Sequence, residues 1–118
     1  MLIINKLEKN YLKMENKEKI LNFIGLAKRA GKVTTGEDIL LNAIKKNKIK
    51  FLFIPSDAGK ASYKKFMDKS NYYGIPVNNM FVKNDLSNAI GMKRTIIGIS
   101  DSGFAKRLNE MTNNCKGT

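Results

Sequence analysis

Two short and almost wholly apolar segments constrain the fold of this chain most strongly. Residues 51 to 55 read FLFIP, and residues 95 to 100 read TIIGIS. Runs of apolar and β-branched residues without polar alternation are typical of strands that are covered on both faces. Pro55 marks the end of the first run. A sheet built from such strands needs helices on both sides, so we predict an α/β fold.

The segments around these strands carry apolar residues at helical spacing. In residues 17 to 30, the stripe is formed by Ile20, Phe23, Ile24 and Ala27. Further helices are predicted over residues 36 to 46, 60 to 73, 84 to 90 and from about 102 onward, with extended segments at 32 to 35 and 75 to 82. This alternation predicts a three-layer α/β/α sandwich with a mostly parallel or mixed sheet.

Several carboxylates stand where a helix is predicted to begin. Thr34 with Glu37, and Thr35 with Asp38, have the spacing of a capping box. The other carboxylates in such positions are Asp57, Asp85 and Asp101. Capping explains these acidic side chains better than catalysis does, because a helix start leaves backbone N–H groups that need acceptors.

The length of 118 residues suits one compact domain. We predict a loose N-terminal extension over residues 1 to 16, the domain over residues 17 to 112 and a C-terminal tail over residues 113 to 118, which includes the single cysteine, Cys115. The sequence has neither an apolar run long enough to span a membrane nor a secretory signal core. We therefore expect a cytoplasmic protein, and we expect it to be a monomer.

The residues that most catalytic sites depend on are scarce. The chain has no histidine and one cysteine, which argues against a zinc site and removes the commonest general base. The segment SDAGKAS at residues 56 to 62 is not a P-loop, because Ile54 stands where that motif needs glycine and Ala61 follows Lys60. We expect no enzyme activity, no cofactor and no metal.

The charge balance is the strongest compositional signal. Twenty-two basic residues face ten acidic ones, which gives a net charge of +12 and a pI of about 9.9. Such a balance is typical of a nucleic-acid-binding domain. An acidic protein partner or an anionic membrane surface would attract the same charge. Nucleic acid without a membrane partner is our prediction, and a module that docks an acidic protein through the same basic face is the alternative.

One stretch concentrates this charge beside a predicted helix start. Residues 28 to 46 read KRAGKVTTGEDILLNAIKK, in which Gly31 and Gly36 bracket a chain reversal. Residues 28 to 50 contain seven basic residues and two acidic ones. A helix start presents unpaired N–H groups and partial positive charge, so this region is suited to bind phosphate.

A family resemblance covers residues 18 to 110. LNFIGLAKRAGKVTTGEDILLNAIKKNKIKFLFIPSDAGK, followed by YYGIPV, LSNAIG and ISDSGFAKRL, resembles the bacterial YlxQ branch of the kink-turn RNA-binding ribosomal-protein superfamily in order and spacing. The resemblance implies an α/β/α sandwich with a four-stranded mixed sheet, no enzyme activity, and structured RNA, including ribosomal RNA, as the ligand.

The resemblance also implies two RNA-contacting segments. At the start of the second helix, Gly36, Glu37, Asp38, Ile39 and Asn42 match the positions that contact RNA in relatives, although only Gly36 keeps the residue type. The second segment is the loop that follows Gly91. The predicted RNA contacts, from charge and resemblance together, are Lys28, Arg29, Lys32, Thr34, Thr35, Gly36, Glu37, Asp38, Ile39, Asn42, Lys46, Ile90, Gly91, Met92, Lys93 and Arg94.

This assignment predicts which lysines matter for RNA affinity. Charge reversal at Lys28 and Lys32 is expected to weaken RNA binding more than reversal at Lys64 and Lys65 in the third helix, because only the first pair lies near the proposed face. A filter-binding titration of the four variants measures this difference. Equal losses would contradict the face.

Overall fold

The computed structural model describes residues 6 to 116, and it describes side chains from Glu15 to Cys115. Five helices and four strands are described in this range. In chain order the elements are α1 (Lys6–Arg29), β1 (Val33–Thr35), α2 (Glu37–Lys45), β2 (Phe51–Phe53), α3 (Lys60–Tyr73), β3 (Val77–Asn78), α4 (Lys83–Ile90), β4 (Ile97–Ile99) and α5 (Ser102–Lys116). None of the described helices is long and apolar enough to cross a bilayer.

The four strands form one mixed sheet in the order β1-β4-β2-β3. Strand β4 runs antiparallel to both of its neighbours, whereas β2 and β3 are parallel. The two apolar segments of the sequence are thus the central pair, β2 and β4, in which Leu52 lies opposite Gly98. The predicted four-stranded mixed sheet is confirmed.

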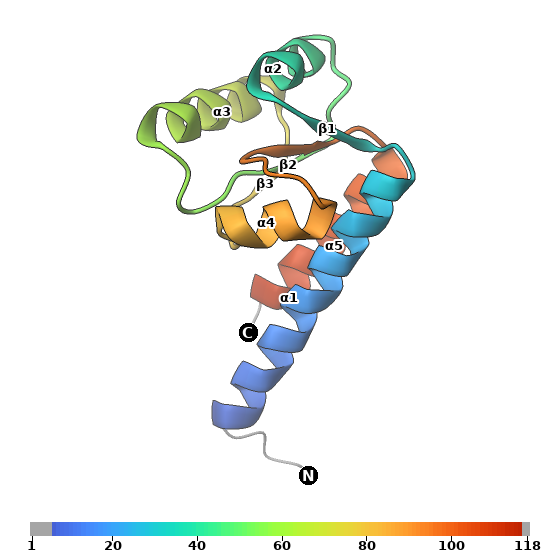
Figure 1. The fold of residues 1–118 in the computed structure, drawn as a ribbon, viewed down its shortest axis with the longest axis vertical. Coiled ribbons are helices and arrows are strands. Elements are labelled where there is room, and N and C mark those ends of the chain that lie inside the picture. The colour runs from blue at the N-terminus through green and yellow to red at the C-terminus, as the bar shows by residue number, and fades with distance from the viewer. Residues whose placement is uncertain (1–5, 117–118) are drawn as a thin grey trace.

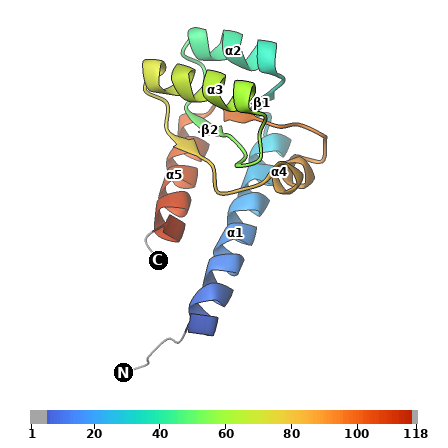
Figure 2. The ribbon, with the colours of Figure 1, turned by 90° about the vertical axis from the view of Figure 1, so that its left-hand side faces the viewer.

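Helices cover both faces of the sheet, which confirms the three-layer sandwich. Helices α2 and α3 lie on one face, and α1, α4 and α5 lie on the other (Figures 1 and 2). A hydrophobic core lies on each face of the sheet. Alternate residues of each central strand pack into one core or the other, because successive side chains of a strand point to opposite faces. Phe51 and Phe53 pack toward α1, α4 and α5, while Leu52 and Ile54 pack toward α2 and α3. Double-sided burial explains the continuous apolar runs.

Gly98 sets the distance between β4 and α2. A Cβ atom at this position would lie 2.5 Å from Leu40 Cδ1 and 3.1 Å from Ile49 Cδ1. Leu40 is fully buried and occupies the space above the glycine. The glycine in TIIGIS is therefore a requirement of close helix-on-sheet packing, and it fixes the height of α2 above the sheet.

The N-terminal boundary differs from the prediction. We expected a loose extension up to residue 16 and a helix from residue 17, but α1 already begins at Lys6. The segment from 6 to 16 contains good helix formers and neither glycine nor proline, so the backbone hydrogen-bond ladder has no local reason to stop there. Its first turns project beyond the sandwich (Figure 1). Residues 1 to 5 of the predicted extension lie outside the described residues.

The predicted C-terminal tail is also wrong over most of its length. Helix α5 continues to Lys116, and Cys115 is only 6% exposed within the core beneath α1. Cys115 follows Leu108 and Thr112 at helical spacing, and both of these residues are buried. The apolar stripe of α5 therefore extends into the segment that we had assigned to a tail. Residues 117 and 118 lie outside the described residues.

The capping predictions had mixed outcomes. Asp101 caps α5 as predicted, because its Oδ2 accepts the Phe104 N–H at 2.8 Å. The predicted boxes at Thr34 and Thr35 are wrong, since the N-cap of α2 is Gly36 and no described side chain caps it. Asp57 does not cap α3, whose N-cap is Gly59. The Asp57 Oδ1 atom instead accepts the Lys83 N–H at 2.8 Å, at the start of α4.

The segment from 75 to 82 forms less strand than predicted. Strand β3 comprises only Val77 and Asn78. The Asn78 Oδ1 atom accepts the Met80 N–H at 3.1 Å, a local side-chain bond that turns the backbone out of the ladder. Because of this turn, the pairing of β3 with β2 is short, and the chain continues to the start of α4 at Lys83.

The packing at Gly98 predicts a stability effect. Gly98→Ala is expected to lower the free energy of unfolding by about 1–3 kcal/mol, because the methyl group would overlap Leu40 and Ile49. Urea denaturation followed by circular dichroism measures the change. Gly59→Ala is the control, since a Cβ there meets no atom within 4 Å. Equal stability of the two variants would contradict the close approach.

Candidate nucleic-acid interface

The structure brings the two predicted RNA-contacting segments together. Strands β1 and β4 are neighbours, and their register places Thr35, at the end of β1, opposite Ile97, at the start of β4. The chain enters α2 just after Thr35 and enters β4 from the loop that follows Gly91. Arg94 Nε, from this loop, donates to Thr35 Oγ1 at 3.3 Å. The β1–α2 junction and the loop therefore form one continuous surface.

Short-range bonds fix the loop of residues 91 to 94. Gly91 ends α4 in the left-handed region at φ 71°, and the Met92 N–H donates to the Ser87 carbonyl at 3.2 Å. The Ser87 hydroxyl donates to the Arg94 carbonyl at 2.8 Å and accepts the Arg94 N–H at 3.2 Å. The side chains of Met92, Lys93 and Arg94 remain exposed. The loop thus presents an apolar group and two cations on a fixed backbone.

The start of α2 presents a mixed polar and apolar face. Gly36 adopts φ 90°, a conformation that favours glycine, and it turns the chain into the helix. Leu40 and Ile44 face the core, so Asp38, Ile39 and Asn42 face solvent. Ile39 is 67% exposed, so its apolar side chain is available for contact with a ligand. This face offers one carboxylate, one carboxamide and one apolar contact.

Glu37 is turned toward the neighbouring helix. The Ser62 hydroxyl of α3 donates to Glu37 Oε1, and Lys65 Nζ lies 3.6 Å from Glu37 Oε2. These contacts tie the first turn of α2 to α3 and partly offset the negative charge at the helix start. The sequence predicts that Lys65 lies outside the proposed face, but the structure has it beside the start of α2. Lys64 remains outside, and Asp68 raises the pKa of Lys64 through a hydrogen bond and its negative charge.

The predicted cations are spread over a wide area. Lys32 lies at the end of β1 away from Thr35, and its carbonyl accepts the Ser100 N–H at 2.9 Å. Lys46 follows the last residue of α2, about 13 Å from the helix start at a rise of 1.5 Å per residue. Thr34 lies between these regions in β1, paired with Gly98. The structure therefore does not gather Lys32 and Lys46 with the loop and the α2 start.

Two grooves lie on either side of α4. The α1–α4 groove has a volume of about 720 Å³ and gathers four predicted residues, Lys28, Arg29, Ile90 and Gly91. The α4–loop groove has a volume of about 800 Å³ and includes the other three loop residues. Asn88 and Gly91 line both grooves. The end of α1, α4 and the loop thus form one path along the surface.

Sequence reasoning missed the contribution of α4 itself. Lys83, Asn84, Ser87 and Asn88 line the α4–loop groove. Leu86 and Ile90 are buried at i and i+4, and the missed residues occupy the remaining face of the same helix. A helical projection of residues 83 to 90 would have found this polar face.

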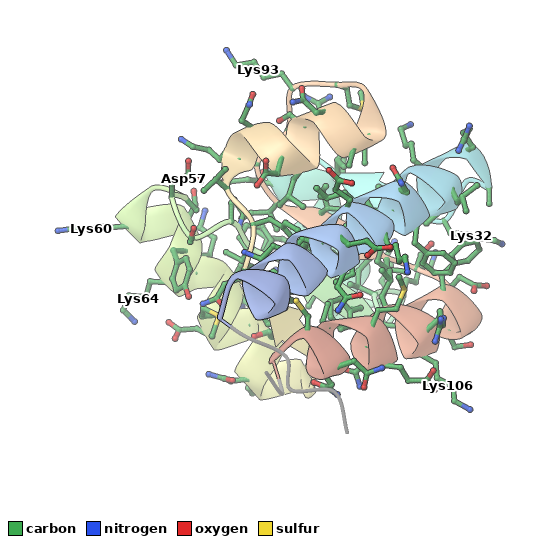
Figure 3. All side chains as sticks on the ribbon, turned by 90° about the horizontal axis from the view of Figure 1, so that it is seen from below. Lys32, Asp57, Lys60, Lys64, Lys93 and Lys106 are labelled. Atoms are coloured by element: carbon green, nitrogen blue, oxygen red, sulfur yellow. The ribbon has the colours of Figure 1, made fainter. Side chains whose placement is uncertain are left out.

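The described side chains of this surface offer several kinds of contact. Among residues 15 to 115, no three histidine, cysteine, aspartate or glutamate side chains gather as metal ligands would. Figure 3 shows lysines projecting outward on several sides, with Lys93 on the side opposite Lys106. Cations, amides and exposed apolar groups on this surface can contact phosphates, base edges and base faces.

Comparison with known proteins relates this chain to a family. The model of the ribosomal protein L7Ae/L30e/S12e/Gadd45 family matches residues 18–109. The chain is 42% identical over 96 residues to RNA-binding protein YlxQ of Enterococcus faecium, covering 81% of this chain and 93% of the relative. It is 36% identical over 86 residues to RNA-binding protein YlxQ of Bacillus subtilis (strain 168), covering 72% and 86%.

Solved structures agree with these sequence relatives. A Bacillus halodurans protein of unknown function superposes with a TM-score of 0.77 at 35% identity, covering 80% of this chain and 97% of that one. The 15.5 kDa RNA binding protein of Giardia lamblia superposes with a TM-score of 0.72 at 16% identity, covering 87% and 89%. The second likeness shows a shared fold.

The bonds at Ser87 predict how firmly the loop is held. Ser87→Ala removes both contacts to Arg94, so the N–H of Arg94 is expected to exchange with solvent at least about fivefold faster, because two hydrogen bonds of about 0.5–1.5 kcal/mol each are lost. Amide hydrogen exchange by NMR measures the rate. Ser102→Ala, at an exposed position on α5, is the control. Unchanged exchange at Arg94 would show that other contacts hold the loop.

Proposed function

The chain belongs to the ribosomal protein L7Ae/L30e/S12e/Gadd45 family, and from this premise we propose that it is a non-enzymatic protein that binds structured RNA. The proposed interface comprises the β1–α2 junction and the loop after Gly91. The names of the two YlxQ relatives, both called RNA-binding proteins, support the ligand class. The net charge of +12 supports an anionic polymer as the partner.

One observation carries the proposal, namely the hydrogen bond from Arg94 to Thr35. It links a helix start without a side-chain cap to a loop with two cations, so that one ligand can contact both. Neither segment alone offers more than a few contacts. Joined, they form one surface that a regular duplex would meet at few points, whereas a bent or looped strand would meet both parts.

The chemistry of the surface favours RNA with unstacked bases. Structured RNA is recognised through shape, splayed bases and the backbone. Asp38 and Asn42 can bond base edges, and the exposed Ile39 and Met92 can cover base faces. Lys93 and Arg94 are exposed cations that can contact phosphates. This combination supports a loop or a kinked helix as the target.

The finer parts of the proposal concern the RNA and its setting. We propose a kink-turn or a related loop as the target, with ribosomal RNA as the first candidate. The Ile39 side chain cannot hydrogen-bond a base, so it contributes apolar contact only. Hydrogen bonds to base edges are then made by Asp38 and Asn42. We further propose that the protein acts in the cytoplasm as a monomer.

The salt dependence of binding tests the interface. Lys93→Ala is expected to weaken binding to a kink-turn hairpin RNA and to lower the slope of log affinity against log salt by about one, because each phosphate contact releases counterions. Fluorescence anisotropy at several salt concentrations measures this slope. Lys106→Ala is the matched control, since Lys106 lies on α5, on the opposite side of the molecule (Figure 3).

Two outcomes would overturn the proposal. Equal slopes for the two variants would remove the loop from the interface. If the wild-type protein bound the hairpin no better than a DNA duplex of equal charge at about 150 mM salt, nonspecific attraction alone would explain the affinity. A protein partner that co-purifies after ribonuclease treatment, combined with that second result, would establish the acidic-partner alternative.

A further inference from the structure

The α1–α4 groove separates charges of opposite sign within one concave surface. Its cations are Lys28 and Arg29, both from the last turn of α1. Its carboxylate is Asp85, in the first turn of α4. The volume of about 720 Å³ lies in the range of small-ligand sites. Such a groove suits a ligand that carries both an anion and hydrogen-bond donors.

Backbone packing fixes the two walls of the groove. A Cβ atom on Gly25 would lie 3.0 Å from the Ala89 carbonyl oxygen, so the glycine allows α1 and α4 to approach closely. Ile90 is buried beneath the groove and anchors α4. Side chains on two packed helices keep their relative positions better than side chains on loops do. The groove is therefore preformed.

The wall formed by α4 offers a specific order of hydrogen-bonding groups. Asp85 and Asn88 are separated by three positions, which places them as neighbours on one helix face. Asp85 Oδ2 accepts the Val82 N–H at a long 3.5 Å, and a carboxylate has acceptor capacity beyond that one bond. Asn88 is exposed and carries both a donor and an acceptor. The wall thus presents two carboxylate acceptors beside an amide donor.

We propose that this groove binds the guanine base of a nucleotide that flanks the structured RNA, an inference that rests on the proposed function. The Watson–Crick edge of guanine presents two adjacent donors, N1–H and N2–H, next to the O6 acceptor. Asp85 takes the two donors and the Asn88 amide takes O6. Adenine, cytosine and uracil do not present two adjacent donors on this edge.

The cations complete the assignment to a nucleotide. Lys28 and Arg29 bind the phosphate of the same nucleotide or of its neighbour, through charge-assisted hydrogen bonds. An acidic peptide would also meet these cations, but Asp85 would repel it. Gly91 lines both grooves, so a strand leaving the loop surface can continue into the α1–α4 groove.

Titration with mononucleotides tests the groove without a structured RNA. GMP, AMP, CMP and UMP are added separately to ¹⁵N-labelled full-length protein, and the amide shifts of Gly25, Asn88 and Gly91 are followed by NMR. GMP is expected to bind about tenfold more tightly than the other three, in line with one good bidentate pair. Asp85→Asn is expected to remove this preference, because it replaces an acceptor pair by a mixed amide.

The matched control is Asp68→Asn, which makes the same charge change on α3, where Asp68 pairs with Lys64 at 2.9 Å. It is expected to leave the GMP preference unchanged. Equal affinities of the four nucleotides, or a GMP preference that survives Asp85→Asn, would overturn the assignment. The kink-turn hairpin is titrated separately. If the hairpin fails to bind while GMP remains preferred, the proposed function fails and the base specificity of the groove stands.

Discussion

The contact between Leu40 and Gly98 is the constraint on which the rest of the structure depends. Because β4 lacks a side chain at this point, α2 lies low over the centre of the sheet, and Leu40 fills the space that a Cβ would need. The same strand is paired on both sides, so its position is fixed by β1 and β2. The start of α2, which carries the candidate interface, is therefore held against the centre of the sheet.

The pairing of β1 with β4 also brings the two candidate segments into one surface. The register of β1 with β4 brings the end of one strand to the beginning of the other, and each of these strand ends continues into a candidate RNA-binding segment. Arg94 then bonds to Thr35 across the junction. This arrangement would favour the proposed RNA ligand, since contacts that are positioned before binding cost less entropy when the ligand arrives.

Two carboxylates near the interface are engaged within the protein. Glu37 is engaged by Ser62 and Lys65 of α3, so its carboxylate does not face the ligand alone. Asp57 is likewise occupied at the start of α4 by the Lys83 N–H. These acidic side chains stabilise the framework, whereas Lys93 and Arg94 project from it.

The sequence by itself determined the layers, the central strands and the existence of two candidate segments. The apolar residues of a segment show which of its faces are buried, and this pattern can be read from the segment alone. FLFIP and TIIGIS are examples, because both are apolar on both faces. The start of α1 and the end of α5 were predicted wrongly. Both segments are rich in polar residues, so few apolar residues mark the helical period there. Only the tertiary structure decided that Thr35 meets Arg94 and that Lys28 shares a groove with Asp85. Such neighbours are separated by more than 50 residues in the chain, and their meeting depends on strand register and helix packing, which no local pattern encodes.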